Sequence, residues 1–494
     1  MLQDDKIYVG KSVAGPALLE LRLANRHGLV TGATGTGKTV TLQTLAEGFS
    51  DAGVAVFASD IKGDLSGIAA VGEPKPFVKK RLDELGIKDY SNKAYPTVFW
   101  DVMGEKGHPI RATVNDMGAL LLSRMLELNE VQEGVLNIAF RVAADEKMPL
   151  DDLNDLRAIV SNIAERGKEL TTKYGNVATA SVGAIQRRIL VLEEQGAGHF
   201  FGLPALDIKD FVRTAPDGRG IVNILAADKL MEKPRLYAVF LLWMLSKLWQ
   251  TLPEVGDQPK PKLVFFFDEA HLLFNDAPKP LLERIEQIAR LVRSKGVGVY
   301  FVTQNPMDVP NTVSAQLGNR VQHALRAFTP QEAKAVETAA KTFRQNPDLD
   351  TAEAIKELKV GEALVSFLEN KGEPSMVQRV LICPPQAQIG PITDEQRKGC
   401  IEYSPVFGKY EDRQERDSAK EMLDKRAGAE TQEADASGGG GWLGSIFGVG
   451  KNAKTGRYNQ GMGDMIFKDM QRTASRTAAT MIKNIIMKSL GMKK

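Results

Sequence analysis

The sequence is poor in the residues that build disulfide frameworks and zinc sites. It contains two cysteines, Cys383 and Cys400, and five histidines, none of them clustered. No group of these residues has the spacing of zinc ligands. We therefore expect neither a disulfide-stapled fold nor a zinc site, and the low cysteine content favours a reducing compartment, the cytoplasm.

Long apolar runs are also missing. The N-terminus lacks the apolar stretch of a secretory signal peptide. The longest apolar run, Ala238–Leu245, is too short to span a bilayer and predicts a buried helix. With 43% hydrophobic and 26% charged residues among 494, the composition is typical of a soluble globular protein of one to three domains without an integral membrane segment.

The chain has little net charge, +2, so its composition alone does not indicate a nucleic-acid-binding protein. The charge is unevenly distributed, however. Residues 451–494 contain 10 basic and 2 acidic side chains, and the rest of the chain contains 54 basic and 60 acidic ones. A basic surface for nucleic acid on the main body must therefore be local.

The strongest signal is a glycine-rich stretch that matches the P-loop pattern G-x-x-x-x-G-K-[ST]. The residues that we expect to contact a nucleotide are Gly32, Ala33, Thr34, Gly35, Thr36, Gly37, Lys38, Thr39 and Val40. The pattern requires a strand before the loop and a helix after it. The apolar run Gly28–Thr31 and the helical run Val40–Ala46 supply both, which a chance glycine-rich turn would lack.

Each part of this loop has a physical role in binding phosphate. The glycines allow backbone torsions that turn successive N–H groups toward an anion. The following helix adds the positive end of its dipole. Lys38 can reach the β- and γ-phosphates of ATP, and the Thr39 hydroxyl suits Mg²⁺.

An apolar strand that ends in two acids predicts the hydrolytic half of the site. Phe265, Phe266 and Phe267 precede Asp268 and Glu269, the pattern of a Walker B element. Asp268 would hold Mg²⁺, and Glu269 would orient and deprotonate the attacking water. The alternative is an ordinary strand followed by the acidic first turn of a helix.

Further polar residues follow later strands. Gln304 ends the next strand, where it would sense the γ-phosphate or position water; the alternative is a plain turn before Pro306. Arg320 and Arg326 are candidates for the arginine that neutralises charge during phosphoryl transfer, although surface arginines are common.

The stretch Ser59–Asp64 follows the second strand of the series. It would order the magnesium shell or link the nucleotide state to the next loop. That loop carries a basic cluster, which is either a phosphate-contacting patch or a solvated basic helix face, the interpretation we favour. The cluster consists of Lys75, Lys79, Lys80 and Arg81.

Strand-length apolar runs alternate with helical runs, which predicts an α/β fold. We expect a RecA-like P-loop NTPase core, a mainly parallel sheet flanked by helices, with a helical insertion and a C-terminal helical tail. The expected strands are Gly28–Thr31, Val54–Ala58, Thr97–Trp100, Gly220–Leu225, Lys262–Phe267, Val297–Thr303, Val321–Phe328, Glu362–Phe367 and Val377–Ile382, with one or two short strands near Ile7–Val9. The expected parts are 1–111 (core with P-loop), 112–196 (insertion of four or five helices), 197–395 (core with Walker B), 396–436 (charged segment) and 437–494 (glycine linker and basic amphipathic tail).

Two C-terminal segments carry separate expectations. Tyr410–Glu433 is crowded with charges of both signs and predicts a solvated helix or a disordered segment. Met465–Leu490 has apolar residues at helical spacing among lysines. We expect this tail to pack on the assembled protein or to be partly disordered. The alternative is a basic helix that binds DNA or an anionic membrane.

Five motifs in order resemble the HerA/FtsK group of P-loop ATPases. They are Gly32–Thr39, Asp60–Asp64, Asp268–His271, Thr303-Gln304 and Arg320. The stretches Gly183–Arg188 and Gly361–Ser366 look like a bacterial HerA-like family of uncharacterised role. The resemblance implies a homo-hexameric ring, nucleotide between subunits, an arginine finger from the neighbour, and translocation on or unwinding of DNA.

The sequence departs from that group in two places. HerA carries an N-terminal β-barrel, whereas fewer than about thirty residues precede the P-loop strand here, so a nuclease partner docked through a barrel is not supported. FtsK carries a C-terminal winged-helix DNA-reading domain, and this chain has a charged segment, a glycine linker and a basic helix instead.

Three functional hypotheses follow from these features. The first is a Mg²⁺-dependent ATPase ring that moves along DNA. The second is a secretion- or conjugation-type ATPase acting on protein or DNA–protein substrates, which the slightly acidic body favours somewhat. The third is a module whose assembly is gated by ATP, with a partner recruited by the tail. A GTPase is disfavoured because the sequence has no N/T-K-x-D motif, which would recognise guanine. A small-molecule kinase is disfavoured because Glu269 suits the activation of water rather than of a bound acceptor.

Overall fold

The computed structural model describes residues 2–256, 258–274 and 279–437. The chain divides into two units, Met1–Lys420 and Glu421–Lys494. The first unit contains the sheet and the helical insertion, and the described part of the second belongs to helix α16 (Ala419–Ser437). The expectations for the glycine linker and the basic tail fall on residues 438–494, outside the described residues.

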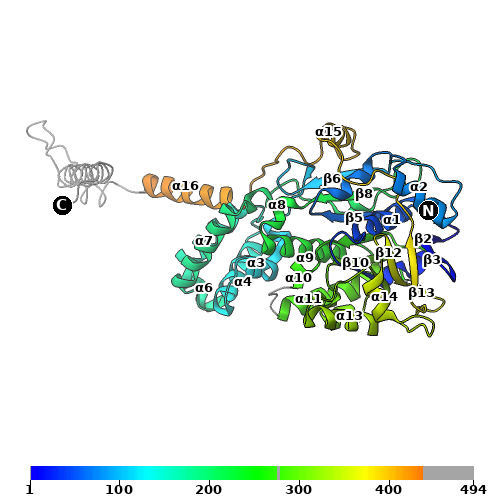
Figure 1. Cartoon of the computed structure of the whole chain (residues 1–494). Coiled ribbons are helices and arrows are strands. Elements are labelled where there is room, and N and C mark those ends of the chain that lie inside the picture. The colour runs from blue at the N-terminus through cyan, green and yellow to red at the C-terminus, as the bar shows by residue number, and fades with distance from the viewer. Residues whose placement is uncertain (1, 257, 275–278, 438–494) are drawn as a thin grey trace, which may run out of the picture. The chain divides into compact units, whose positions relative to one another are not determined.

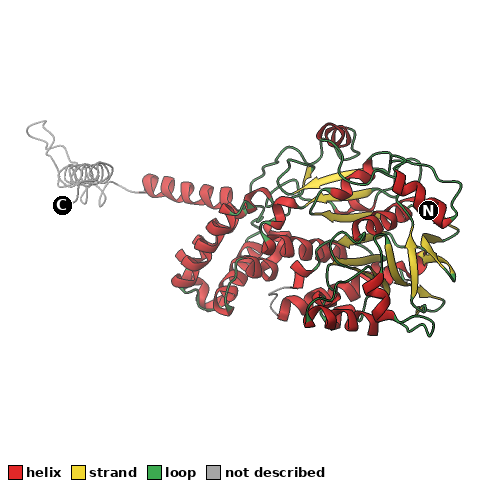
Figure 2. Cartoon of the chain, viewed as in Figure 1, coloured by secondary structure: helices red, strands yellow, loops and turns green. Residues whose placement is uncertain are grey.

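The first unit is built on a 13-stranded sheet with helices on both faces (Figures 1 and 2). Eight neighbouring strands are parallel: β11 (Asn319–Gln322), β4 (Gly28–Thr31), β10 (Val297–Thr303), β9 (Leu263–Phe267), β5 (Ala55–Asp60), β8 (Val222–Ala226), β6 (Thr97–Asp101) and β7 (His108–Pro109). Beside β11, the sheet continues with antiparallel strands: β12 (Glu362–Ser366), β15 (Gln378–Ile382), β2 (Lys6–Ser12), β3 (Gly15–Glu20) and β1 (Leu2–Gln3). This mostly parallel sheet with flanking helices confirms the predicted α/β fold class.

Alternation of side chains explains why the central strands are apolar throughout. Phe266 points to the face covered by α1 (Lys38–Asp51), where it packs near Phe49 with ring centroids 6.2 Å apart. Phe265, one residue earlier, stacks on Phe57 of β5 at 4.7 Å. Because helices cover both faces, every residue of β9 is buried and the strand needs no polar side.

The remaining helices connect the strands or flank the sheet. They are α2 (Pro76–Leu85), α8 (Asp228–Met231), α9 (Pro234–Thr251), α10 (His271–Phe274), α11 (Lys279–Val292), α12 (Asn311–Ser314), α13 (Pro330–Lys341), α14 (Thr351–Glu357) and α15 (Asp394–Glu402), and a small hairpin is formed by β13 (Leu368–Glu369) and β14 (Glu373–Pro374). Within the described parts of the chain, no helix combines the length and the apolarity needed to cross a bilayer.

Five helices lie in the segment where four or five were expected (Figure 1). They are α3 (Val114–Met125), α4 (Glu130–Asp145), α5 (Leu153–Glu165), α6 (Gly167–Tyr174) and α7 (Thr179–Glu194). Side chains of Thr113, Asn129 and Asp152 cap α3, α4 and α5 by accepting hydrogen bonds from first-turn N–H groups. An ion pair of 2.7 Å between Asp116 and Lys247 links this insertion to α9.

One predicted strand is too long. Val321–Phe328 was expected to be extended, but β11 ends at Gln322. Beyond that point the backbone leaves the sheet, because the Ala324 carbonyl accepts a hydrogen bond from the P-loop N–H of Ala33 (2.9 Å) and the Leu325 N–H donates to Ile355 O (3.4 Å). The apolar pattern therefore reflects packing under the P-loop as well as the strand.

The expectation of a solvated segment from Tyr410 is wrong at its start. Tyr410 is fully buried, its hydroxyl donates to Asp210 (2.5 Å), and its carbonyl accepts from Arg111 (2.7 Å). Arg416 forms a bidentate ion pair with Asp151 of the insertion at 2.6 and 2.7 Å. The charges in this stretch are therefore used to hold it against the core and the insertion.

Candidate nucleotide-binding site

Four adjacent strands are followed by polar residues at the same edge of the sheet. In the order β4, β10, β9, β5, all parallel, the carboxyl ends lead to the P-loop, to Gln304, to Asp268-Glu269 and to Lys62. The register aligns Thr303 with Thr31 and Phe301 with Phe267. Since β10 lies between β4 and β9, Gln304 stands between the P-loop and the Walker B acids.

The first P-loop glycine is required by a close approach. Gly32 has φ +151°, and a Cβ at this position would lie 2.4 Å from the Cβ of His323. The loop leads into α1, which begins at Lys38 without a side-chain cap on its first N–H groups. These groups remain available to an anion, and the helix dipole favours negative charge there.

Lys38 is held by the loop itself. Its Nζ donates to Gly32 O (2.6 Å) and to Ala33 O (3.1 Å). Burial lowers the pKa of Lys38, and the nearby carboxylates of Glu269 and Asp268 act in the opposite direction. The lysine charge is thus placed beside the loop that would cradle phosphates.

His323 forms the floor under this loop, a role that the sequence did not indicate. Its Nδ1 donates to Glu362 O (2.9 Å), so its Nε2 is free to accept from the Thr41 hydroxyl (2.9 Å). Burial lowers the pKa of His323 to about 4, which keeps the ring neutral at pH 7. A histidine directly after a strand gives little sequence signal, and its contact with Gly32 depends on tertiary structure.

Asp268 is held at the end of β9 by its own backbone and by β5. Its Oδ1 accepts from the Glu269 N–H (2.9 Å), and its N–H donates to Ser59 Oγ (3.2 Å). The hydroxyl of Tyr237 donates to the same Ser59 Oγ (2.8 Å). Burial, and then the charge of Glu269, raises the pKa of Asp268 to about 6. A bound cation would reverse this shift.

Glu269 adopts an unusual backbone conformation and is almost fully buried, with φ +48° and 4% exposure. Gln304 Nε2 lies 3.2 Å from both carboxylate oxygens, and His271 Nδ1 lies 3.3 Å from Oε2. Lys62 Nζ lies 3.6 Å from Oε1. Strained non-glycine residues cluster at functional sites, where neighbouring groups hold them in place.

Asp60 supports the loop that carries Lys62. Its carboxylate accepts from the N–H groups of Gly63 (2.8 Å), Leu65 (3.1 Å) and Ser66 (3.2 Å). Burial raises the pKa of Asp60 to about 7. These bonds give Asp60 a structural role in shaping the turn.

The two candidate arginines lie on and after β11, on the other side of β4. Arg320 is partly buried and donates to Ser314 O (2.8 Å) and Ser314 Oγ (3.3 Å), whereas Arg326 is exposed. In the part of the chain that the structure describes, neither pairs with a P-loop or Walker B side chain. The site within one chain therefore brings together Lys38, Glu269 and Gln304 but not the arginines.

The basic cluster after the second expected strand separates into two kinds of residue. Arg81 donates to Gly361 O (2.6 Å) and Ile382 O (3.3 Å), and Lys75 donates to Ile389 O (3.3 Å). Lys79 and Lys80 are exposed on α2. Two of the four cations thus bind backbone carbonyls, and two lie on a solvated helix face.

The oxygen donors at the P-loop and at the end of β9 suit a hard cation such as Mg²⁺. Among the described residues, no group of three or more His, Cys, Asp or Glu side chains could hold a metal ion. Thr39 and Asp268 instead offer hydroxyl and carboxylate oxygens, and Mg²⁺ is usually bound through one or two protein oxygens together with substrate phosphates and water. The residues present therefore fit a Mg²⁺–nucleotide complex.

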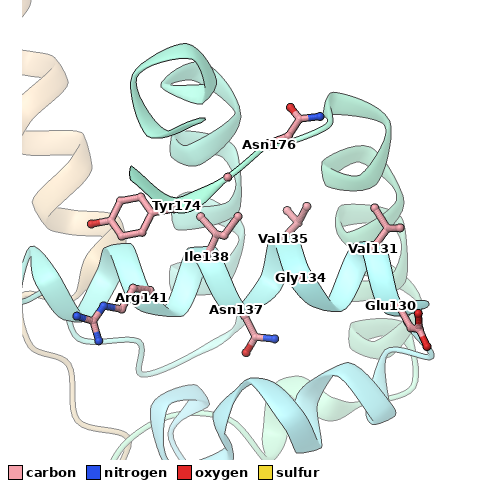
Figure 3. Close-up of a pocket in the computed structure, with 10 residues that line it drawn as sticks. Glu130, Val131, Gly134, Val135, Asn137, Ile138, Arg141, Tyr174 and Asn176 are labelled. Atoms are coloured by element: carbon pink, nitrogen blue, oxygen red, sulfur yellow. The ribbon is translucent and has the colours of Figure 1, made fainter. Parts of the chain in front are cut away.

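A groove of about 450 Å³ lies elsewhere, on the helical insertion. Figure 3 shows Val131, Val135 and Ile138 along α4, beneath the segment that carries Tyr174 and Asn176. None of the residues that line it belongs to the P-loop or to the strand ends described above. The groove is therefore separate from the candidate nucleotide site.

Comparisons with known proteins agree with this architecture. The family model "Helicase HerA-like C-terminal" matches residues 7–494. The DNA double-strand break repair helicase HerA of Sulfolobus acidocaldarius is 21% identical over 377 residues, which cover 73% of this chain and 66% of that helicase.

Solved structures of two other proteins show a similar fold. The bacterial conjugative coupling protein TrwB matches with a TM-score of 0.51 and 16% identity over 78% of this chain and 89% of its own, and it has also been solved with ADP and Mg²⁺. VirB4 of Thermoanaerobacter pseudethanolicus matches with a TM-score of 0.51 and 13% identity over 80% of this chain and 99% of its own.

Proposed function

Because this chain belongs to the helicase HerA-like C-terminal family, we propose that it is a Mg²⁺-dependent ATPase that forms a hexameric ring and translocates on or unwinds DNA. One observation carries the catalytic part of the proposal. Four adjacent strand ends bring a P-loop, a polar amide, two acids and a lysine to one edge of the sheet. The HerA helicase relative, whose length the chain spans to 66%, supports the DNA-handling part.

The residues of the site divide the reaction between them. The P-loop N–H groups and Lys38 would bind the ATP phosphates and neutralise their charge. Glu269 would accept a proton from water as the water oxygen bonds to the γ-phosphorus and the bond to the β–γ bridging oxygen breaks, releasing ADP. Gln304, which lies within 3.2 Å of Glu269 and 3.4 Å from the Thr34 hydroxyl, would orient that water or sense the γ-phosphate.

A magnesium ion fits the same site. Mg²⁺, when bound, would be held by Thr39 and Asp268 and would neutralise the charge that develops on the phosphates. TrwB, a protein of similar fold, has been solved with ADP and Mg²⁺, which supports the binding of a magnesium–nucleotide complex by this fold.

Ring formation would supply the arginine that the single chain does not bring to its own P-loop. A finger must reach into a neighbouring subunit, so it needs an accessible side chain. Arg326 is exposed, whereas Arg320 is bonded to Ser314. Accessibility therefore favours Arg326 of the two.

ATP hydrolysis measured with and without double-stranded DNA tests the proposal, with Glu269→Gln as the blank. Hydrolysis that rises with DNA and is lost in Glu269→Gln supports a DNA motor. No hydrolysis above the Glu269→Gln background would overturn the enzymatic proposal.

A second candidate is a secretion- or conjugation-type ATPase that acts on protein or DNA–protein substrates. The body of the chain outside residues 451–494, with 54 basic and 60 acidic residues, offers no overall attraction for DNA, which favours this alternative. Hydrolysis that is indifferent to DNA, together with capture of a secretion component in a pull-down, would support it over the DNA motor.

A further inference from the structure

Three side chains bring nitrogen atoms close to the two oxygens of the Glu269 carboxylate. Gln304 contacts both of its oxygens at 3.2 Å, His271 contacts Oε2 at 3.3 Å, and Lys62 lies 3.6 Å from Oε1. A general base must turn a free lone pair toward the water that it deprotonates. In this arrangement, the three side chains crowd the carboxylate, and movement of one of them opens an oxygen of Glu269 to that water.

Lys62 is the donor that can leave most easily. Its side chain is 52% exposed and its distance from the carboxylate is the longest of the three, whereas Gln304 also contacts Thr34 of the P-loop. It lies on the turn that Asp60 shapes through three backbone hydrogen bonds. The turn is thus fixed at its base, while the long lysine side chain is free to move.

We propose that Lys62 is a positioning residue that restrains Glu269, and that a phosphate of a nucleic-acid backbone releases the restraint by drawing the Lys62 ammonium away. The inference rests on the proposed ATPase function and adds its regulation. The γ-phosphate of ATP is not this group, because ATP is bound in every turnover and the restraint would then already be absent when kcat is measured without DNA. The phosphates of a nucleic-acid backbone are anions that an exposed lysine at this edge of the sheet can bind.

The backbone at Glu269 fits a residue with two arrangements. Its φ of +48° is rarely adopted by a non-glycine residue and is maintained here by contacts from three different segments. Removing one of these contacts changes the balance that holds the carboxylate. Lys62 lies outside the P-loop, so its removal leaves the residues of the P-loop in place.

Lys62→Met tests the restraint because it removes the charge and keeps the length of the side chain. A half-exposed ion pair is weak, so we expect kcat for ATP without DNA to rise about three- to fivefold, with KM changed by less than about twofold. Lys62→Arg keeps the charge and should show less than half of this rise. Lys79→Met, an exposed lysine on α2, serves as the matched control and should hydrolyse ATP at the wild-type rate.

Adding DNA tests whether nucleic acid releases Lys62. If the nucleic-acid backbone releases Lys62, DNA will no longer stimulate Lys62→Met. DNA that still stimulates Lys62→Met by the same factor as wild type would overturn release by nucleic acid. A kcat of Lys62→Met without DNA at or below that of wild type overturns the restraint, provided that its thermal unfolding midpoint matches that of Lys79→Met.

Failure of this inference is distinguishable from failure of the proposed function. If wild type hydrolyses ATP, Glu269→Gln does not, and Lys62→Met shows no rise, then only the restraint is wrong. If wild type and Glu269→Gln do not differ, the ATPase proposal itself fails.

Discussion

Replacing Tyr410 tests whether the segment after α15 is part of the folded core. The Tyr410 ring lies against Trp100 with centroids 5.4 Å apart, and its hydroxyl donates to Asp210 and accepts from the Asp207 N–H (3.1 Å). Burial disfavours the charge of Asp210, but hydrogen bonds from Lys409 and Tyr410 outweigh it and lower the pKa of this carboxyl. The Tyr410 hydroxyl therefore stabilises the buried Asp210 carboxylate.

The two parts of the side chain give two magnitudes. Tyr410→Phe removes a hydrogen bond to a charged group, which costs about 1.5–3 kcal/mol. Tyr410→Ala also removes a buried ring, which costs about 3–5 kcal/mol for a large aromatic side chain. Tyr403, in the same segment, is 90% exposed and serves as the control. Tyr403→Ala should change stability by less than about 0.5 kcal/mol.

Urea unfolding followed by tryptophan fluorescence measures these differences, since Trp100 contacts Tyr410 directly. We expect the unfolding midpoints in the order Tyr403→Ala, Tyr410→Phe, Tyr410→Ala, from highest to lowest. If Tyr410→Ala unfolds at the same urea concentration as Tyr403→Ala, the segment does not contribute to the core and the argument is refuted.

Two further predictions concern the nucleotide site. Gly32→Ala places a Cβ 2.4 Å from the Cβ of His323, which Thr41 and Glu362 hold in place, so the Kd for ATP should rise at least about 100-fold. The Cβ of Gly35→Ala meets no atom within 4 Å, so this substitution should raise the Kd for ATP by less than about tenfold. Equal effects in a fluorescent-nucleotide titration would contradict this steric argument. Burial raises the pKa of Asp60 to about 7 in the folded protein, whereas the pKa is about 3.9 in the unfolded chain. The stability that the protonated Asp60 contributes is therefore complete below about pH 4 and is lost as the pH rises through 7. The difference in free energy of unfolding between pH 5 and pH 8 should therefore be smaller in Asp60→Asn than in wild type by roughly 2.5 kcal/mol, and an unchanged difference would show that Asp60 does not titrate in this range.

The sequence predicted the elements that depend on local pattern. The P-loop strand, the Walker B strand and the strand before Gln304 were expected at Gly28–Thr31, Lys262–Phe267 and Val297–Thr303, and the structure has β4, β9 and β10 at nearly the same bounds. Apolar runs followed by polar residues identify buried parallel strands and their carboxyl ends. The residues at these ends could therefore be named before their neighbours were known.

Contacts between distant segments could not be predicted in this way. His323 and Glu362 lie 39 residues apart, and their hydrogen bond under the P-loop depends on the pairing of β11 with β12. The contact between Lys62 and Glu269 depends on the adjacency of β5 and β9. Sheet order, which hydrophobic periodicity does not encode, decides both.

Charge patterning was misleading around Tyr410 for a related reason. Mixed charges indicate a solvated segment when their partners are water or each other. Here Lys409 and Arg416 pair with Asp210 and Asp151, which lie about 200 and 265 residues earlier in the chain. Composition counts charges but does not identify the residues with which they pair.

The most direct test of the account compares ATP hydrolysis by wild type and Glu269→Gln, with the exposed Glu254→Gln as the matched control. We predict that Glu269→Gln lowers kcat by at least about 100-fold while the Kd for ATP changes by less than about threefold, because a base is removed and the P-loop is untouched. Hydrolysis by Glu269→Gln at the rate of Glu254→Gln would contradict the assignment of Glu269 as the base at this sheet edge.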